Sequence, residues 1–182
     1  GPVGWVTRSR SSVFKGSRYG APLVGVLRFR APVPTEPWTE VADAGEYGCA
    51  CPQPPLPGIP LDLGARQDED CLTLNIWAPT GGAGAKPVMV WLHGGAYVLG
   101  SGSQPFYDGN RLADSRDALI ATMNYRLGAF GFLDLSVFNR PTSTFDSNIG
   151  LRDVLAALQW VQDNIAAFGG DPERVTLFGE SA

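Results

Sequence analysis

Hydrophobic and polar residues follow a strand-like pattern in four short segments of this chain. Residues 72–77 (Leu-Thr-Leu-Asn-Ile-Trp) alternate and are rich in residue types that favour β-structure, which predicts a strand. Residues 88–92 form a continuous apolar run, which is typical of a strand buried on both faces. Residues 118–123 and 174–178 predict two further strands, the last from the run Arg-Val-Thr-Leu-Phe.

One segment, residues 147–168, has the spacing of an amphipathic helix. Apolar residues recur there at intervals of three and four and form one face: Leu151, Val154, Leu155, Leu158, Val161, Ile165 and Phe168. Asp146 or Ser147 can cap the start of this helix, and the glycine pair 169–170, followed by Pro172, ends it.

The lengths of the connections constrain how these elements join. The linker 79–86 between the first two strands is too short for a crossover helix, so these strands are expected to pair antiparallel. The third strand follows about 25 residues after the second, which allows a crossover and a parallel pairing. Residues 1–50 predict an edge region of small strands and loops, and the proline-rich residues 51–64 predict an extended surface loop. Together the pattern predicts an α/β sheet with antiparallel edge strands.

Composition narrows the class of protein. With 182 residues, 44% hydrophobic and 18% charged, the chain is typical of a globular domain with a sizeable core. A net charge of -4 argues against a nucleic-acid partner, because no basic stripe is available to neutralise phosphates. No apolar run approaches the roughly 18 residues of a membrane span. The first residues carry no signal-peptide pattern, and the compartment stays open.

Two glycine-rich segments carry the candidate chemistry. Gly179-Glu180-Ser181-Ala182 matches the first part of a G-x-S-x-G nucleophile elbow, in which a sharp strand-to-helix turn lifts the serine hydroxyl above the sheet. His93-Gly94-Gly95-Ala96 follows the predicted strand 88–92, and its small residues let backbone N–H groups point at a developing oxyanion. A glycine pair alone is weak evidence, but acyl transfer needs both segments. The two together predict a serine hydrolase.

The only histidine of the chain, His93, lies in the wrong place to be the general base. In this hydrolase class the order along the chain is Ser, then Asp or Glu, then His, whereas His93 precedes Ser181. We therefore expect its ring to order the glycine-rich loop by hydrogen bonding. The base and acid are then expected in a continuation of the sequence, present in the same polypeptide or as a separate chain. Residues 1–182 are accordingly interpreted as the N-terminal portion of a single catalytic domain.

Longer motifs resemble those of the type-B carboxylesterases, the carboxylesterase/cholinesterase family. Residues 69–79 (Glu-Asp-Cys-Leu-Thr-Leu-Asn-Ile-Trp-Ala-Pro) are similar to one family signature, and residues 168–182 are similar to the serine signature. Other matching blocks are 124–133, 147–151 and Arg28-Phe29 with Pro32, Pro34 and Trp38. The resemblance implies the N-terminal part of an α/β-hydrolase fold, with a mostly parallel central sheet, antiparallel edge strands and flanking helices.

The resemblance also implies roles for individual residues. Ser181 would be the acyl-forming nucleophile, and the backbone N–H groups of Gly95, Ala96 and Ala182 would form the oxyanion hole. Gly94 and Glu180 would line the site. The resemblance further implies two ion pairs that brace the sheet, Arg28 with Glu69 and Arg126 with Asp153. The chemistry requires neither a metal nor an organic cofactor.

Three cysteines leave two interpretations open when only the residues are considered. A bridge between Cys51 and Cys71 would stabilise the fold by roughly 3 kcal/mol in the chain-entropy model. Alternatively, both residues and Cys49 are reduced thiols of a cytosolic protein. Neither a C-x-x-C pair nor a His/Cys cluster is present, so no zinc site is expected. The family resemblance implies the Cys51–Cys71 disulfide.

The expected substrates are small to medium carboxylic esters with apolar acyl or aryl parts. Residues 52–68 contain no aromatic side chain that could hold a quaternary ammonium group, so choline-ester specificity is not expected. An amidase or carbamate hydrolase of the same fold is the alternative enzyme. A catalytically inactive, cholinesterase-like binding domain is the alternative from another functional class.

Overall fold

The computed structural model describes residues 5–6, 11–37, 39–55, 57–58, 60–81 and 83–182; Trp38 of the family block therefore lies outside the described residues. Within this part of the chain, one sheet has the strand order β1-β2-β3-β5-β4-β6. Its strands are β1 (Trp5–Val6), β2 (Ser11–Arg18), β3 (Thr73–Pro79), β4 (Lys86–Leu92), β5 (Leu119–Met123) and β6 (Gly170–Gly179). The helices are α1 (Asn110–Arg116), α2 (Gly128–Phe132) and α3 (Ile149–Asn164).

The sheet is antiparallel on one side and parallel on the other. β4 pairs parallel with β5 and with β6, whereas β3 pairs antiparallel with β5 and with β2. The parallel pairing expected for residues 88–92 and 118–123 is therefore confirmed. The antiparallel ribbon β1–β2 forms the edge region expected from residues 1–50, which also contain the short 3₁₀ helix Gly25–Leu27.

The expected direct pairing of β3 with β4 is wrong, because β5 lies between them. Ile120 of β5 is opposite Trp77 of β3 on one side and opposite Met89 of β4 on the other. A linker of this length can span about 10 Å, the distance across one intervening strand. Because the linker is short, no crossover helix can connect β3 to β4. A strand from later in the sequence can still lie between them. β5, buried at every position, takes the central place.

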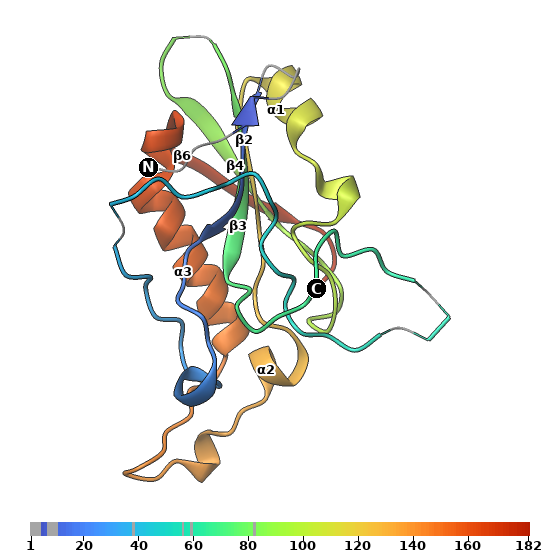
Figure 1. Cartoon of the computed structure of the whole chain (residues 1–182), viewed down its shortest axis with the longest axis vertical. Helices are drawn as coiled ribbons and strands as arrows, with labels where there is room; N and C mark the ends of the chain where they lie inside the picture. The colour runs from blue at the N-terminus through green and yellow to red at the C-terminus, as the bar shows by residue number, and fades with distance from the viewer. Residues whose placement is uncertain (1–4, 7–10, 38, 56, 59, 82) are drawn as a thin grey trace.

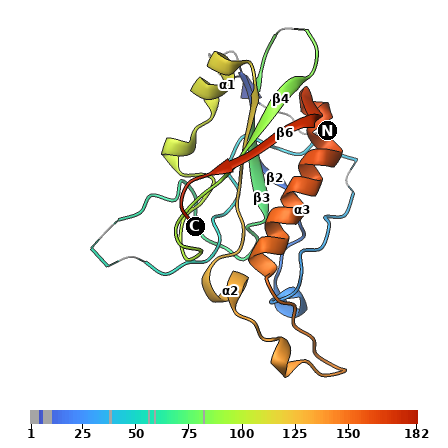
Figure 2. The same ribbon diagram turned by 180° about the vertical axis from the view of Figure 1, so that it is seen from behind.

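Two hydrophobic layers cover the two faces of the sheet. Figures 1 and 2 show α3 along one face, whereas α1 lies on the other side of the sheet. Successive residues of β5 belong to different layers: Leu119 and Ala121 pack in the core that contains α3, and Ile120 packs with Ala113 of α1. This alternation is expected of a strand whose side chains point to opposite faces.

The predicted amphipathic helix is confirmed as α3, followed by the 3₁₀ turn Ile165–Phe168 and ended by Gly169, whose φ is +86°. Its predicted apolar face is only partly right, because Leu151 and Leu155 are exposed. The predicted cap is wrong. Asn148 occupies the N-cap position with φ +51°, and no side chain caps the helix. The Asp146 carboxylate instead accepts a hydrogen bond from the Ala31 N–H (2.8 Å), because a tertiary partner is available to it.

The covalent and ionic braces implied by the family resemblance are present. Cys51 and Cys71 form a disulfide, and Cys49 is a free thiol. Arg126 binds the fully buried Asp153 through its Nη2, 2.6 Å from Oδ1. The more exposed pair joins Arg28 Nη2 to Glu69 Oε1 at 2.5 Å. Among the described residues, no helix is long and apolar enough to cross a membrane.

Candidate active site

The two predicted catalytic segments leave the same edge of the sheet from neighbouring strands. β4 and β6 are parallel and adjacent, with Leu92 opposite Gly179. Residues 93–96 and 180–182 therefore start side by side at the carboxyl ends of these strands. Ligands bind at such strand ends in open α/β sheets.

Ser181 has the backbone conformation of a nucleophile elbow. Its φ is +64°, in the left-handed region that a residue with a side chain rarely occupies, and the residue is exposed. Such strain persists where the surrounding structure over-determines it and is common at functional sites. Gly179 begins the turn so close to β4 that a Cβ there would lie 2.7 Å from the Leu92 carbonyl oxygen. The turn therefore needs glycine at this position.

Gly94 brings the glycine-rich loop into contact with the elbow. A Cβ at Gly94 would lie 2.4 Å from the Glu180 carbonyl oxygen and 3.0 Å from Cβ of Ser181. Only a residue without a side chain allows this approach. On the other side of the turn, the Tyr97 N–H donates a hydrogen bond to the Ala182 carbonyl (3.2 Å). The structure thus places the loop and the serine against each other.

The peptide planes of the loop are fixed through their carbonyl groups. The Gly95 carbonyl accepts hydrogen bonds from Val98 N (3.0 Å) and Leu99 N (3.1 Å). Because the peptide group is planar and trans, the Ala96 N–H of the same peptide points the opposite way. Among the described residues, none accepts a hydrogen bond from the N–H groups of Gly95, Ala96 or Ala182. These donors are available to a ligand.

His93 is buried under this loop and holds it, as expected from its place in the sequence. The ring is 2% exposed, stacks on Tyr125 with a centroid distance of 4.5 Å, and places Nδ1 2.9 Å from the Gly94 carbonyl oxygen. A carbonyl only accepts, so Nδ1 carries the hydrogen. Burial lowers the pKa of His93 to about 4. The ring is therefore neutral and fixes the Gly94–Gly95 peptide plane.

Glu180 lies on the exposed side of the elbow, near an aromatic cluster. Burial raises the pKa of Tyr107, and the Glu180 carboxylate adds to that rise. The Tyr107 ring packs on Trp91 (5.0 Å between centroids), which also packs on Phe178 (5.0 Å). These rings line a groove of about 600 Å³ beside the strands that lead to both loops.

Sequence reasoning missed Gln53 and Tyr125, which hold the loop from other segments, and Tyr97 of the loop itself, whose carbonyl accepts a hydrogen bond from the Gly128 N–H (2.6 Å). The Tyr125 hydroxyl donates to the His93 carbonyl (2.7 Å), and its pKa is raised to about 12 by burial. Gln53 forms two hydrogen bonds with the backbone of Gly100. Tyr125 lies inside a block already matched to the family, so the motif was a signal for it. No pattern in the sequence distinguishes Gln53.

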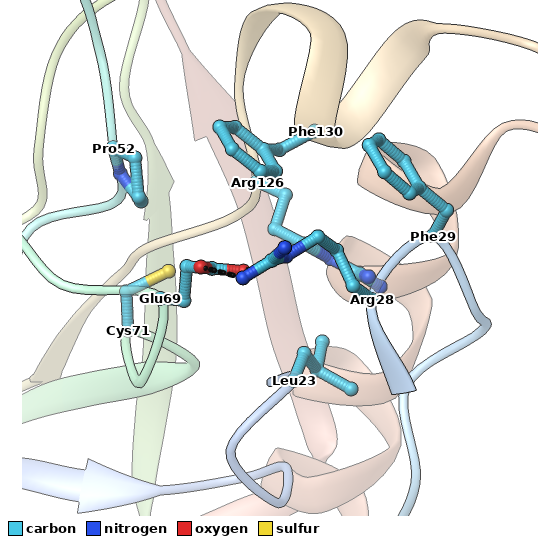
Figure 3. Close-up of a pocket in the computed structure, with 8 residues that line it drawn as sticks. All are labelled: Leu23, Arg28, Phe29, Pro52, Glu69, Cys71, Arg126 and Phe130. Atoms are coloured by element: carbon cyan, nitrogen blue, oxygen red, sulfur yellow. Dashed lines mark hydrogen bonds and ion pairs between the residues drawn. The ribbon is translucent and has the colours of Figure 1, made fainter. Parts of the chain in front are cut away.

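A small cavity lies outside the two catalytic loops. It is lined by Leu23, Arg28, Phe29, Pro52, Glu69, Cys71, Arg126 and Phe130 and has a volume of about 10 Å³ (Figure 3). This is room for roughly one water molecule. The Arg28–Glu69 pair crosses it, and none of its lining residues belongs to either loop. Across the described ranges, no group of three or more His, Cys, Asp or Glu side chains could hold a metal ion.

Comparison with known proteins finds esterases and a related hydrolase. The model of the carboxylesterase family matches residues 4–182. The chain is 50% identical to the para-nitrobenzyl esterase of Bacillus subtilis (strain 168) over its whole length, and this match covers 37% of that relative. It is 44% identical to the phenmedipham hydrolase of Pseudarthrobacter oxydans, of which it covers 36%. The acetylcholinesterase of Electrophorus electricus is 43% identical over 96% of the chain and 28% of the relative.

Solved structures give the same picture. A thermophilic pNB esterase superposes with a TM-score of 0.91 and 48% identity over 99% of this chain and 37% of its own. A second pNB esterase structure gives a TM-score of 0.89 and 49% identity. The fold is therefore that of an α/β-hydrolase, and the chain spans little more than a third of the length of these relatives.

Proposed function

The chain belongs to the carboxylesterase family, and we propose that it supplies the nucleophile and the oxyanion hole of a serine esterase. Ser181 attacks the carbonyl carbon of a carboxylic ester. The N–H groups of Gly95, Ala96 and Ala182 bind the oxygen that becomes negatively charged. Residues 1–182 are the N-terminal portion of one catalytic domain in this proposal.

One observation carries the proposal: Gly94 contacts Ser181 while the neighbouring N–H groups of the loop have no acceptor among the described residues. Preorganised donors next to a nucleophile stabilise the charge that develops in acyl transfer. A loop that served only to connect strands would have no need of these free donors beside a strained serine.

The reaction proceeds through a covalent acyl-enzyme. A base takes the Ser181 proton as the hydroxyl oxygen bonds to the carbonyl carbon, and the protonated base then gives that proton to the departing alkoxide. Water, activated by the same base, attacks the acyl group and releases the acid and the free serine. The oxyanion donors, Ser181 and the base thus act in both halves of the reaction.

We propose that the base and its acidic partner come from the rest of the protein. A serine hydroxyl is a weak nucleophile without an adjacent base. The single histidine of this chain is buried, and its Nδ1 is engaged with the Gly94 carbonyl. The chain spans 37% of the para-nitrobenzyl esterase it resembles, which leaves a long remainder to provide both groups.

The proposed substrates are small to medium esters with apolar acyl or aryl parts. The name of the para-nitrobenzyl relative, which acts on an aryl-bearing ester, agrees with this class. Acetylcholine is not proposed, although acetylcholinesterases are among the relatives, because residues 52–68 lack an aromatic side chain for the quaternary ammonium. Carbamate hydrolysis is the second candidate, because a relative 44% identical to this chain is a carbamate hydrolase.

A fluorophosphonate probe on the full-length protein tests the proposal. The wild type and the control Ser115→Ala, at an exposed serine of α1, should be labelled, and Ser181→Ala should not. Ser181→Ala should also lower kcat for p-nitrophenyl acetate by about 10⁴-fold or more. An unlabelled wild type would favour the inactive binding domain. Turnover of p-nitroacetanilide or of an aryl carbamate at a rate comparable to the ester would favour the alternative enzyme.

A further inference from the structure

Gln53, in the proline-rich segment before β3, binds the end of the glycine-rich loop with both atoms of its side-chain amide. Its Oε1 accepts a hydrogen bond from the Gly100 N–H (2.8 Å), and its Nε2 donates to the Gly100 carbonyl (2.8 Å). Gly100 is buried. Because both of its backbone polar groups are engaged by one side chain, Gln53 fixes the position of Gly100 and the orientation of its peptide groups.

Gly100 in turn packs against the residues that orient the oxyanion donors. Its φ is +111°, and a Cβ at this position would lie 2.5 Å from Nδ1 of His93 and 2.6 Å from the Gly94 carbonyl oxygen. The backbone of Gly100 is thus one wall of the space in which the hydrogen bond from His93 to Gly94 forms. A displacement of Gly100 would change the position of both partners.

The Gly94 carbonyl sets the direction of a proposed oxyanion donor. It belongs to the same peptide group as the Gly95 N–H, and the two point in opposite directions. The contacts therefore run from Gln53 through Gly100 and His93 to the Gly95 N–H. Each step is a hydrogen bond or a close backbone contact in the structure.

Gln53 is itself fixed from the other side. Its backbone N–H donates to Oε1 of Gln67 (2.8 Å), and its Nε2 also donates to the Cys51 carbonyl (3.0 Å). Cys51 is joined to Cys71 by the disulfide, which closes this segment. Figures 1 and 2 show the segment before β3 running past the C-terminal end of the chain. The clamp on Gly100 therefore rests on a covalently closed loop.

We propose that Gln53 is a positioning residue for acyl transfer, which ties the oxyanion loop to the disulfide-closed segment so that the Gly95 N–H faces the reacting carbonyl. The inference rests on the proposed esterase function. Gln53 does not touch the substrate in this proposal. It acts on the transition state alone, because the donor it orients binds the oxygen only when charge develops there.

The test compares Gln53→Leu with the wild type in the full-length enzyme, with Gln159→Leu on the exposed face of α3 as the matched control. Active sites are titrated first, so that kcat refers to folded enzyme. We expect kcat for p-nitrophenyl acetate to fall about tenfold in Gln53→Leu, less than the full loss of one oxyanion donor, with KM within about twofold. The Ki of an aryl trifluoromethyl ketone, which forms an oxyanion on the serine, should rise by the same factor. The control should change neither value.

A second variant covers the case in which Gln53→Leu does not fold. Gln53→Glu keeps the shape and the acceptor for the Gly100 N–H, but it turns an oxygen instead of an N–H towards the Gly100 carbonyl. In this variant too, kcat should fall about tenfold while KM stays within about twofold of the wild-type value. The inference would be overturned if the folded variants had the same kcat per titrated site and the same Ki as the wild type, even with a lower melting temperature. A wild type that neither reacts with the probe nor hydrolyses esters would overturn the proposed function, and this inference with it.

Discussion

The two loops that meet at the candidate site are held in place in different ways. The glycine-rich loop 93–100 is buried at both ends, at His93 and Gly100, and side chains from other segments bind each end. The elbow 180–182 is exposed, and Gly94 and the Tyr97 N–H of that loop contact it. The Gly95 and Ala96 donors are therefore held by other segments of this chain, whereas the elbow, which carries Ser181 and the Ala182 donor, is contacted by the donor loop.

This difference separates two parts of the proposed chemistry. The orientation of the Gly95 and Ala96 N–H groups is determined by residues of this chain, since the Gly94 and Gly95 carbonyls of the same peptide groups are engaged in hydrogen bonds. Activation of Ser181 needs a proton acceptor that we assign to the rest of the protein. Changes in the donor loop should therefore affect the transition state, and they should do so most strongly where the two loops touch.

The contact between the loops should be the most sensitive point. Gly94→Ala would place a methyl group 2.4 Å from the Glu180 carbonyl oxygen, so the loop and the elbow must move apart. We expect kcat for p-nitrophenyl acetate to fall by about 10²- to 10³-fold, the loss typical of a removed oxyanion donor. Gly84→Ala, in the β3–β4 linker, is the control: its φ of +85° makes alanine strained there, but no atom lies within 4 Å of the added Cβ, so kcat should be kept even if stability falls. A Gly94→Ala enzyme with normal kcat would show that the contact does not matter for catalysis.

Burial of His93, at the start of the glycine-rich loop, should lower the stability of the folded protein at acidic pH. The folded pKa of His93, about 4, is lower than the value of about 6.5 in an unfolded chain, so the unfolded state binds the proton more readily. The contribution of the neutral His93 ring to the free energy of unfolding is therefore fully present above about pH 6.5. About 3 kcal/mol is lost as pH falls from about 6.5 to about 4. Urea unfolding of the wild type and of His93→Gln over this range measures the effect. The stability of the wild type should fall more steeply with falling pH than that of His93→Gln, and parallel curves would contradict a neutral buried ring.

Much of the sheet could be predicted from the sequence, but the order of its strands could not. Residues 88–92 and 118–123 are strands as predicted, and β5 is buried at every position. The expectation that 88–92 is buried on both faces is wrong, because Val88 and Val90 are buried whereas Met89 and Trp91 are half-buried. Periodicity does not encode which strand is a neighbour, so the position of β5 between β3 and β4 required the tertiary structure. The cap of α3 was predicted wrongly for a similar reason, since Asp146 bonds to Ala31, 115 residues away in sequence.

The candidate site was predictable where short motifs carry the chemistry. Gly94, Gly95, Ala96 and Ser181 lie in such motifs, and the structure places both segments together. Gln53 could not be found in this way, because its partner Gly100 is 47 residues away and nothing in a proline-rich loop marks one polar residue as a clamp. Supporting residues of this kind are specified by tertiary contacts, which a local pattern does not contain.

The smallest expected effect comes from the exposed tip of the loop. Ala96 has φ +54°, a conformation that costs a residue with a Cβ about 1–2 kcal/mol. Ala96→Gly removes this strain but adds conformational entropy to the unfolded state, worth roughly 0.5–1 kcal/mol, so the free energy of unfolding should change by less than about 1 kcal/mol. The Ala96 N–H remains, and its direction is set by the hydrogen bonds to the Gly95 carbonyl, so kcat should stay within about twofold of the wild type.

Ala166→Gly, at an exposed residue of the 3₁₀ turn after α3, is the control and should lose stability by about 0.5–1 kcal/mol, because no left-handed strain is relieved there. A large drop in kcat for Ala96→Gly would mean that the methyl group, and not the bonded carbonyl of Gly95, sets the direction of this donor.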